Sequence, residues 1–141
     1  MTIKIEGLDE VLMQLEELDV ERLEKAVGKA CALVERTAKE GTPKGTGALR
    51  RSIKSRVETD ANGNVLGIIF TPLEYAPYVE FGTGKFAENG NGRKDVPWHY
   101  KDDEGKWHTT SGMKPHPYLR PALYQNENAI KNLIKVALTN D

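Results

Sequence analysis

Three histidines lie close together in the second half of the chain, at positions 99, 108 and 116. A hairpin could bring His99 and His108 opposite one another, and two such imidazoles could bind a metal ion. Zinc needs three or four ligands at the corners of a tetrahedron, however, and no cysteine lies nearby. The acids at 102–104 have the composition of a solvated turn. The sequence therefore predicts no metal site.

The glycine-rich stretch at 82–85 shares only part of the pattern of a phosphate-binding loop. That loop requires four residues between its glycines and a Lys-Ser/Thr pair just before a helix, and both requirements fail here. None of the serines lies in a nucleophile elbow, and no paired carboxylates suggest a cleft. A hydrolase with His99 or His108 as its base would lack a nucleophile. We therefore expect no enzymatic activity, no catalytic residues and no cofactor.

Five positive charges and no negative ones lie between residues 44 and 57, namely Lys44, Arg50, Arg51, Lys54 and Arg56. Such a segment could contact phosphates, with an affinity that falls steeply with salt, or it could be the solvated face of a strand and turn. The first 24 residues have the opposite balance, with eight acids against two basic residues. Opposite patches on one chain favour head-to-tail contacts, which close into rings when the rotation allows it.

Trp98, Tyr100 and Trp107 follow a stretch rich in glycine and asparagine, and they include both tryptophans of the chain. Large aromatic side chains on a surface excursion need something to bury them. They could pack back on their own domain, or they could contact a partner, since aromatic residues dominate the energetics of interfaces. The sequence leaves both alternatives open.

The chain has 141 residues, of which 38% are hydrophobic, and this fits a single domain over residues 1–141. A formal net charge of -1 gives no general attraction to nucleic acid or to anionic membranes. The longest apolar run, at 65–70, is too short to cross a bilayer, and no signal peptide follows Met1. We therefore expect an unexported protein. Cys31 is the single cysteine, which excludes an intrachain disulfide, and its small apolar neighbours suggest that it is buried.

The spacing of hydrophobic residues predicts three helices. The first covers residues 8–18, and the second begins after a cap at Asp19 and ends near Gly41. The third begins at Pro121, a residue that suits the first turn of a helix, and continues to Leu138. At 1.5 Å per residue, the second helix would be about 30 Å long, which is enough to cover a whole sheet.

Between the second and third helices the hydrophobic period changes from that of a helix to that of a strand. After a single turn through 48–50, polar and less polar residues alternate over 53–59, and a β-branched, apolar stretch follows at 65–71. Asn62-Gly63 between them favours a tight turn. The sequence therefore predicts two antiparallel strands.

The next apolar segment, 75–81, contains Pro77, and either an edge strand or a short irregular element fits it. Two short strands are expected at 96–100 and 106–110, within a flexible loop over about 83–112. The predicted fold class is α+β. A small antiparallel sheet would be packed by a long N-terminal helix and a C-terminal helix, with a long protruding loop or hairpin.

Several short motifs follow one another in the order found in one family of phage proteins. They are Gly7-Leu8-Asp9, Pro43 with residues 46–50 and 52–53, the stretch 75–84, and Gly112-Met113 with Pro115 and residues 117–123. In their order and spacing they resemble the family of gene product ten of phage Hong Kong ninety-seven, over nearly the whole chain. Members of that family are described as tail components, or as head-tail joining and tail-completion proteins.

This resemblance implies a structural virion protein of a tailed phage or prophage, without enzymatic activity. It would be made in the host cytoplasm and added as a ring, such as a hexamer, where the tail meets the neck. Its partners would be copies of itself and the neck, connector and tail-tube proteins, with non-specific DNA contact in a channel and no membrane. The alternative is a nucleic-acid-binding module that uses the basic segment 44–56.

The expected contacts with other subunits or partners come from the basic segment, the aromatic stretch and the family motifs. These residues are Arg50, Arg51, Lys54, Arg56, Glu80, Trp98, Tyr100, Trp107 and Arg120. Glu80 could accept a hydrogen bond or an ion pair from Arg50 or Arg120.

Overall fold

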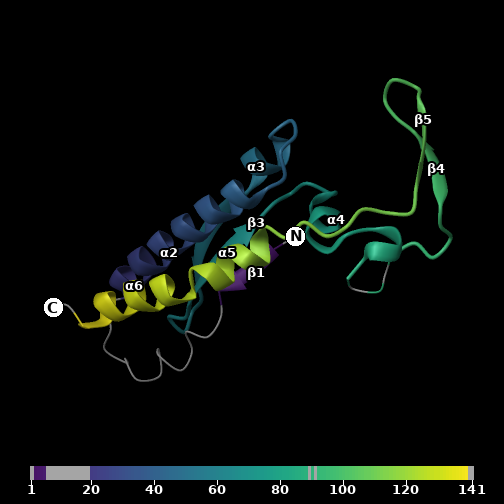
Figure 1. Cartoon of the computed structure of the whole chain (residues 1–141). Coiled ribbons are helices and arrows are strands. Elements are labelled where there is room, and N and C mark those ends of the chain that lie inside the picture. Colours follow the sequence, from purple (N-terminus) through teal and green to yellow (C-terminus); the bar gives the residue numbers. More distant parts are fainter. Residues whose placement is uncertain (1, 6–19, 89, 91, 140–141) are drawn as a thin grey trace. The chain divides into compact units, whose positions relative to one another are not determined.

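The structure is a computed structural model that describes residues 2–5, 20–88, 90 and 92–139 (Figure 1). The helix expected over 8–18 and the cap expected at Asp19 lie outside these residues. The chain divides into two compact units. The first unit consists of Met1–Pro72 together with Tyr118–Asp141, and the second unit consists of Leu73–Pro117. The single domain expected over residues 1–141 stays a prediction.

The first unit contains a three-stranded antiparallel sheet. Its strands are β1 (Thr2–Ile5), β2 (Lys54–Thr59) and β3 (Val65–Phe70), in the order β1-β3-β2. β3 takes the central position because its β-branched and apolar residues suit a strand that is buried on both faces. The hairpin predicted over 53–71 is confirmed, with its first strand beginning at Lys54.

The long helix α2 (Val20–Gly41) packs against β2 and β3 (Figure 1). Its predicted apolar stripe and its end near Gly41 are confirmed, and Cys31 within it is buried. Two hydroxyls of β2 donate hydrogen bonds to carboxylates of α2, from Ser55 to Glu35 at 2.8 Å and from Thr59 to Glu24 at 2.7 Å. Since side chains alternate along a strand, the residues at 54, 56 and 58 point to the sheet face away from α2.

Two helices, rather than the single one predicted, follow at the C-terminal end. They are α5 (Leu119–Gln125), which begins before Pro121, and α6 (Glu127–Thr139), and both pack along α2. Asn126 separates them because its side-chain amide donates hydrogen bonds to the Thr37 hydroxyl and to the Ala122 carbonyl. Asparagine competes with the backbone for such bonds and disfavours a continuous helix.

The second unit begins with the short helix α4 (Ala76–Phe81), followed by the 3-10 turn η1 (Gly84–Phe86). Both alternatives expected for 75–81, an edge strand and a short irregular element, were therefore wrong. Pro77 lies in the first turn of α4, where the missing N–H has no intrahelical partner to lose. The two predicted short strands are confirmed as β4 (Trp98–Lys101) and β5 (Trp107–Thr110), which form an antiparallel pair.

The two hairpins close with the same arrangement of hydrogen bonds. In the β2–β3 turn, the Asp60 carboxylate accepts hydrogen bonds from the backbone N–H groups of Asn62 and Asn64. In the β4–β5 turn, Asp102 accepts them from Glu104 and Lys106, which stand at the same offsets. A carboxylate that binds its own backbone in this way favours a tight turn.

The α+β fold class is confirmed: helices pack on a small antiparallel sheet in the first unit, and the second unit holds a short hairpin. No helix among the described residues combines the length and the apolar character that a membrane span needs.

Candidate interface surfaces

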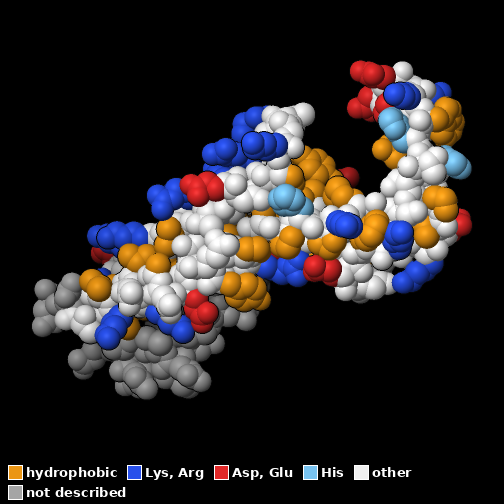
Figure 2. Space-filling model, in the orientation of Figure 1, with side chains coloured by type: hydrophobic (Ala, Val, Ile, Leu, Met, Phe, Trp, Pro, Cys, Tyr) orange, Lys and Arg blue, Asp and Glu red, His pale blue; other side chains and the backbone are white. Residues whose placement is uncertain are grey.

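The five positively charged residues of 44–56 form what we call the basic cluster, and all five are exposed. Two of them, Arg50 and Arg51, belong to the short helix α3 (Ala48–Ser52), which joins α2 to β2. Leu49 and the following Ile53 anchor this helix in the core, since they are 7% and 0% exposed. Figure 2 shows Lys and Arg side chains gathered over α3 and α2. The anchored helix thus presents its arginines to solvent.

The cluster is spread over the loop before α3, which carries Lys44, and over α3 and β2, rather than gathered at one point. Arg51 donates a hydrogen bond back to the Thr46 carbonyl, so it is held beside its own loop. Lys54 and Arg56 lie on β2 and point away from α2, because Ser55 between them faces that helix. Arg56 pairs with Glu58 at 2.8 Å and lies over the Phe70 ring at 4.9 Å.

The aromatic hairpin of β4 and β5 presents an exposed large aromatic side chain on each of its faces. Tyr100 lies opposite His108, and their rings stack at 5.2 Å. Trp107 lies opposite Lys101 on the other face, with the ammonium group 5.8 Å from its ring centre. Tyr100 is 46% exposed and Trp107 is 66% exposed. These two side chains are therefore available to a partner.

His99 and His108 do not face one another, as an arrangement for a metal would require. His99 lies opposite Thr109 and is hydrogen-bonded to its hydroxyl at 2.8 Å. His108 points to the other face and lies 2.7 Å from the Asp102 carboxylate. Among the described residues, no group of three or more metal-binding side chains comes together.

Trp98 differs from the other aromatic residues because it is only half-exposed. The Arg93 guanidinium lies 5.1 Å from its ring centre. Together with Tyr78, Thr83 and the backbone around Gly84, these two residues line a hollow of about 220 Å³ in the second unit. Trp98 thus packs partly on its own unit, in contrast to Tyr100 and Trp107.

A family model described as "Bacteriophage HK97-gp10, putative tail-component" matches residues 6–82, just over half of the chain. The chain belongs to this family of phage tail components. The match spans α2, α3, the β2–β3 hairpin and α4. No curated protein and no solved structure matches the chain.

In this tail component, two glycine-containing motifs that lie almost 30 residues apart in sequence meet within the second unit. Thr83 N–H donates to the Met113 carbonyl at 2.9 Å, and Lys85 N–H donates to the Ser111 carbonyl at 3.0 Å. Gly84 and Gly112 lie at this crossing, both with positive φ, and a Cβ atom at either would overlap the opposite backbone. The two glycines therefore allow the two backbone segments to approach closely, in addition to allowing the chain to reverse its direction.

Glu80 and Arg120 occupy less open positions than the basic cluster. The Glu80 side chain is 0% exposed on α4, while Arg120 on α5 is half-buried. A buried carboxylate is costly unless it is hydrogen-bonded, and no buried side-chain polar atom of the described residues lacks a partner. A role of either residue at an interface, and the pairing of Glu80 with Arg50 or Arg120, stay predictions.

The pKa values of Cys31, Asp60 and Asp102 are shifted, and the causes of the shifts differ. Burial raises the pKa of the Cys31 thiol, and the nearby Glu35 carboxylate adds to the rise. The thiol is therefore a poor nucleophile near neutral pH. The hydrogen bond from His108 and the backbone N–H of Lys106 hold the pKa of Asp102 below its ordinary value.

Sequence reasoning missed one surface feature, a hollow between α2 and α6 of the first unit. The sequence does contain a pattern that indicates this hollow. Ala129, Leu133 and Val136 repeat at helical spacing beside the stripe of Ile130 and Ile134, so α6 is apolar on more than one face.

Proposed function

We propose that this tail component is a structural virion subunit of a tailed phage or prophage, at the place where the tail meets the neck. It serves head-tail joining or tail completion, and it acts by assembling into a ring, such as a hexamer, rather than by catalysis. It is made in the host cytoplasm and then incorporated into the virion. The observation that carries this proposal is the family match over residues 6–82.

The distribution of charge supports assembly of copies head to tail. The basic cluster is exposed, and the sequence of residues 1–24 contains eight acids against two basic residues. Of these acids, Glu21 and Glu24 are among the described residues, and both lie on α2. Surfaces of opposite charge orient two copies, and a contact between different patches repeats around a ring.

The exposed aromatic residues of the second unit support contact with a neighbour. Trp107 and Tyr100 offer large, rigid surfaces that are common at the centres of interfaces. Candidate neighbours are a second copy, a connector protein or a tail-tube protein.

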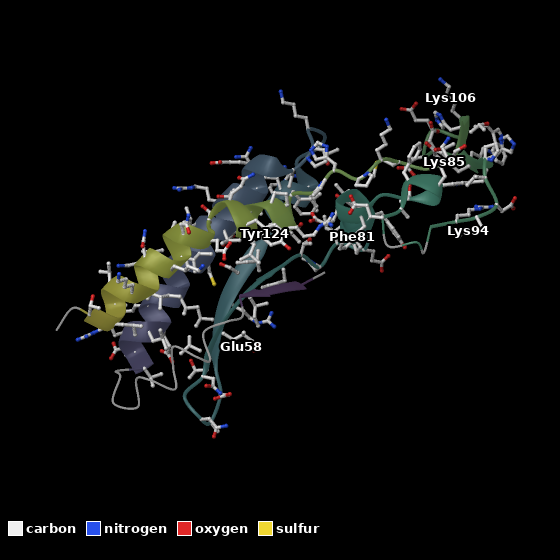
Figure 3. All side chains as sticks on the ribbon, turned by 60° about the horizontal axis from the view of Figure 1, so that its bottom comes forward. Glu58, Phe81, Lys85, Lys94, Lys106 and Tyr124 are labelled. Atoms are coloured by element: carbon white, nitrogen blue, oxygen red, sulfur yellow. The ribbon has the colours of Figure 1, made fainter. Side chains whose placement is uncertain are left out.

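The proposal is tested by native mass spectrometry across protein concentration and salt, with isolated tails as a second binding partner. Reversing the charge of Arg50 and Arg51 to Glu should weaken association by about tenfold or more, because attraction becomes repulsion. A matched double reversal outside the cluster, Lys94→Glu with Lys114→Glu, should change it far less; Lys94 is labelled in Figure 3. A chain that stays monomeric at every concentration and ignores isolated tails would contradict the proposal.

The second candidate, a nucleic-acid-binding module, is favoured by one observation. All five positive charges of the basic cluster are exposed, and no acid lies between them. Binding to duplex DNA through them would fall steeply as salt rises. Failure of the chain to shift a DNA duplex at low salt would remove this candidate.

A further inference from the structure

A hollow of about 570 Å³ lies on the first unit between α2 and α6, which run side by side (Figure 1). Its floor comes from Ala26 of α2 and from Ala129, Leu133, Val136 and Ala137 of α6. The alanines leave room between the two helices instead of filling it. The lining is almost entirely carbon, so the hollow favours an apolar occupant.

Helix α6 carries a second apolar stripe beside the one that faces its own core. Ile130 and Ile134 form the first stripe and are buried against the rest of the unit. Leu133 and Val136 belong to the second, and Val136 is 54% exposed. A helix that faces water on its outer side needs only one stripe. In the part of the chain that the structure describes, no element covers the second one.

One side of the hollow is positively charged. Arg22, Lys25 and Lys29 follow one another on α2 at helical spacing and line this side. Lys25 pairs with Glu21 at 3.4 Å, but both side chains are more than 70% exposed, and such a pair contributes little. No acid contributes to the lining. An occupant should therefore combine an apolar face with negative charges along one flank.

We propose that this hollow binds an acidic amphipathic helix of a neighbouring subunit in the tail. This inference rests on the assembly proposed above, and it identifies a contact through which the subunits would associate. A helix fits because α2 and α6 already lie side by side, and a third helix can lay its apolar ridge into the groove between them. The charged rim from Arg22 to Lys29 extends over about 10 Å of α2, which corresponds to two helical turns of an occupant.

The sequence of this chain supplies a probe with the required chemistry. Residues 8–18 contain five aliphatic side chains at helical spacing, with four acids and no positive charge. On an ideal helix, Asp9 and Glu16 would lie on one flank of that apolar stripe, and Gln14 on the other. A synthetic peptide of residues 6–19, labelled with fluorescein, therefore carries both the apolar face and the acidic flank.

The experiment titrates this peptide with the full-length chain and measures fluorescence anisotropy at low and high salt. We expect saturable binding that weakens with salt. Val136→Glu should weaken it by about tenfold or more, because it places a carboxylate against apolar side chains. Asn128→Glu adds the same charge to α6 outside the hollow and should leave binding unchanged. Melting curves of both variants identify any loss that comes from unfolding.

The contribution of the acidic flank of the peptide is tested with the double variant Lys25→Glu, Lys29→Glu of the full-length chain. This variant should weaken binding and also reduce the weakening of binding by salt, because two attractive charge pairs become repulsive. A peptide in which Asp9 and Glu16 are replaced by the neutral Asn and Gln should show the same two changes with the unaltered chain.

Three outcomes would overturn the inference. The peptide could fail to saturate, it could bind the Val136→Glu variant as well as the unaltered chain, or it could bind only a chain whose own Leu12 and Leu15 are changed to Glu. The last result would mean that each chain fills its own hollow. Sedimentation of the same samples separates the two proposals: assembly without peptide binding rejects the groove contact alone, and peptide binding without assembly rejects the ring alone.

Discussion

Gly84 and Gly112 lie where two segments of the second unit cross, and neither backbone leaves room for a side chain. A Cβ atom at Gly84 would overlap the carbonyl oxygen of Ser111, and its φ of +58 disfavours other residues. Gly84→Ala should therefore destabilise the second unit by more than about 2 kcal/mol, through strain and overlap together. Hydrogen exchange at the amides of Thr83 and Lys85, which bind across the crossing, measures this loss.

A suitable control for Gly84→Ala is Gly45→Ala in the first unit. Gly45 is exposed, and nothing lies within 4 Å of a Cβ atom added there. That substitution should change stability by no more than about 0.5 kcal/mol. Unchanged protection at Thr83 and Lys85 in the Gly84→Ala variant would show that the two segments can separate without cost.

Two residue-level interpretations needed the structure because they depend on register and on tertiary burial. The sequence indicated that a hairpin could pair His99 with His108, but the β4–β5 register is offset by one position, which places them on opposite faces. Glu80 follows two exposed tyrosines, Tyr75 and Tyr78, and nothing in its neighbours predicts that it is 0% exposed. By contrast, the apolar neighbours of Cys31 were enough to predict its burial.

At the scale of elements, the turns of the two hairpins offer a comparison within one molecule. The pKa of Asp102 is lowered first by the hydrogen bond from His108, and that of Asp60 is lowered first by the backbone N–H of Asn64. Because the folded-state pKa of each lies below its unfolded value, each carboxylate stabilises its turn above its ordinary pKa of 3.8. This stabilisation is lost as the pH falls below 3.8 through the folded-state pKa.

His108→Phe keeps a ring against Tyr100 but removes the hydrogen bond to Asp102. We expect the pKa of Asp102 to rise toward 3.8, so that acid weakens the β4–β5 turn at a higher pH than in the unaltered chain. The pKa of Asp60 should stay unchanged in the same sample. Titration of the carboxyl carbon shifts by NMR follows both groups, and an unshifted Asp102 would show that its backbone donors alone lower its pKa.

Most elements of the first unit could be predicted because local pattern and tertiary role agree there. The stripe of α2 and the alternation in β2 follow directly from which face each element buries. α4 could not be assigned, since Pro77 is compatible with an edge strand and with the first turn of a helix. The break between α5 and α6 depends on a hydrogen bond from Asn126 to Thr37, which lies 89 residues away in sequence.

The candidate surfaces could be predicted in composition but not in placement. The sequence indicated five clustered positive charges, yet the pleat of β2 directs Lys54 and Arg56 to the face away from α2, while α3 holds Arg50 and Arg51. The sequence could not decide whether the aromatic residues pack on their own unit. In the structure Trp98 packs partly on its unit, whereas Trp107 is 66% exposed.

At the scale of the whole molecule, the buried apolar residues of the described chain are distributed unequally. Apart from Ala76 and Val79, all of them belong to the first unit. The first unit should therefore fold when residues 73–117 are replaced by about ten Gly and Ser residues, which form a flexible linker. The shorter connection should alter its unfolding free energy by only about 1 kcal/mol, because closure entropy varies slowly with loop length. Circular dichroism during urea unfolding measures both the helical signal and this free energy.

Ile69→Ala, made in the shortened chain and in the full-length chain, tests whether the core is the same in both. Ile69 is 0% exposed on the central strand β3, so its truncation should cost about 2–5 kcal/mol. If the first unit folds on its own, the cost should agree between the two chains, since the residues around Ile69 are unchanged. A smaller cost in the shortened chain, or an unfolded shortened chain, would mean that residues 73–117 complete the core and that residues 1–141 form a single domain.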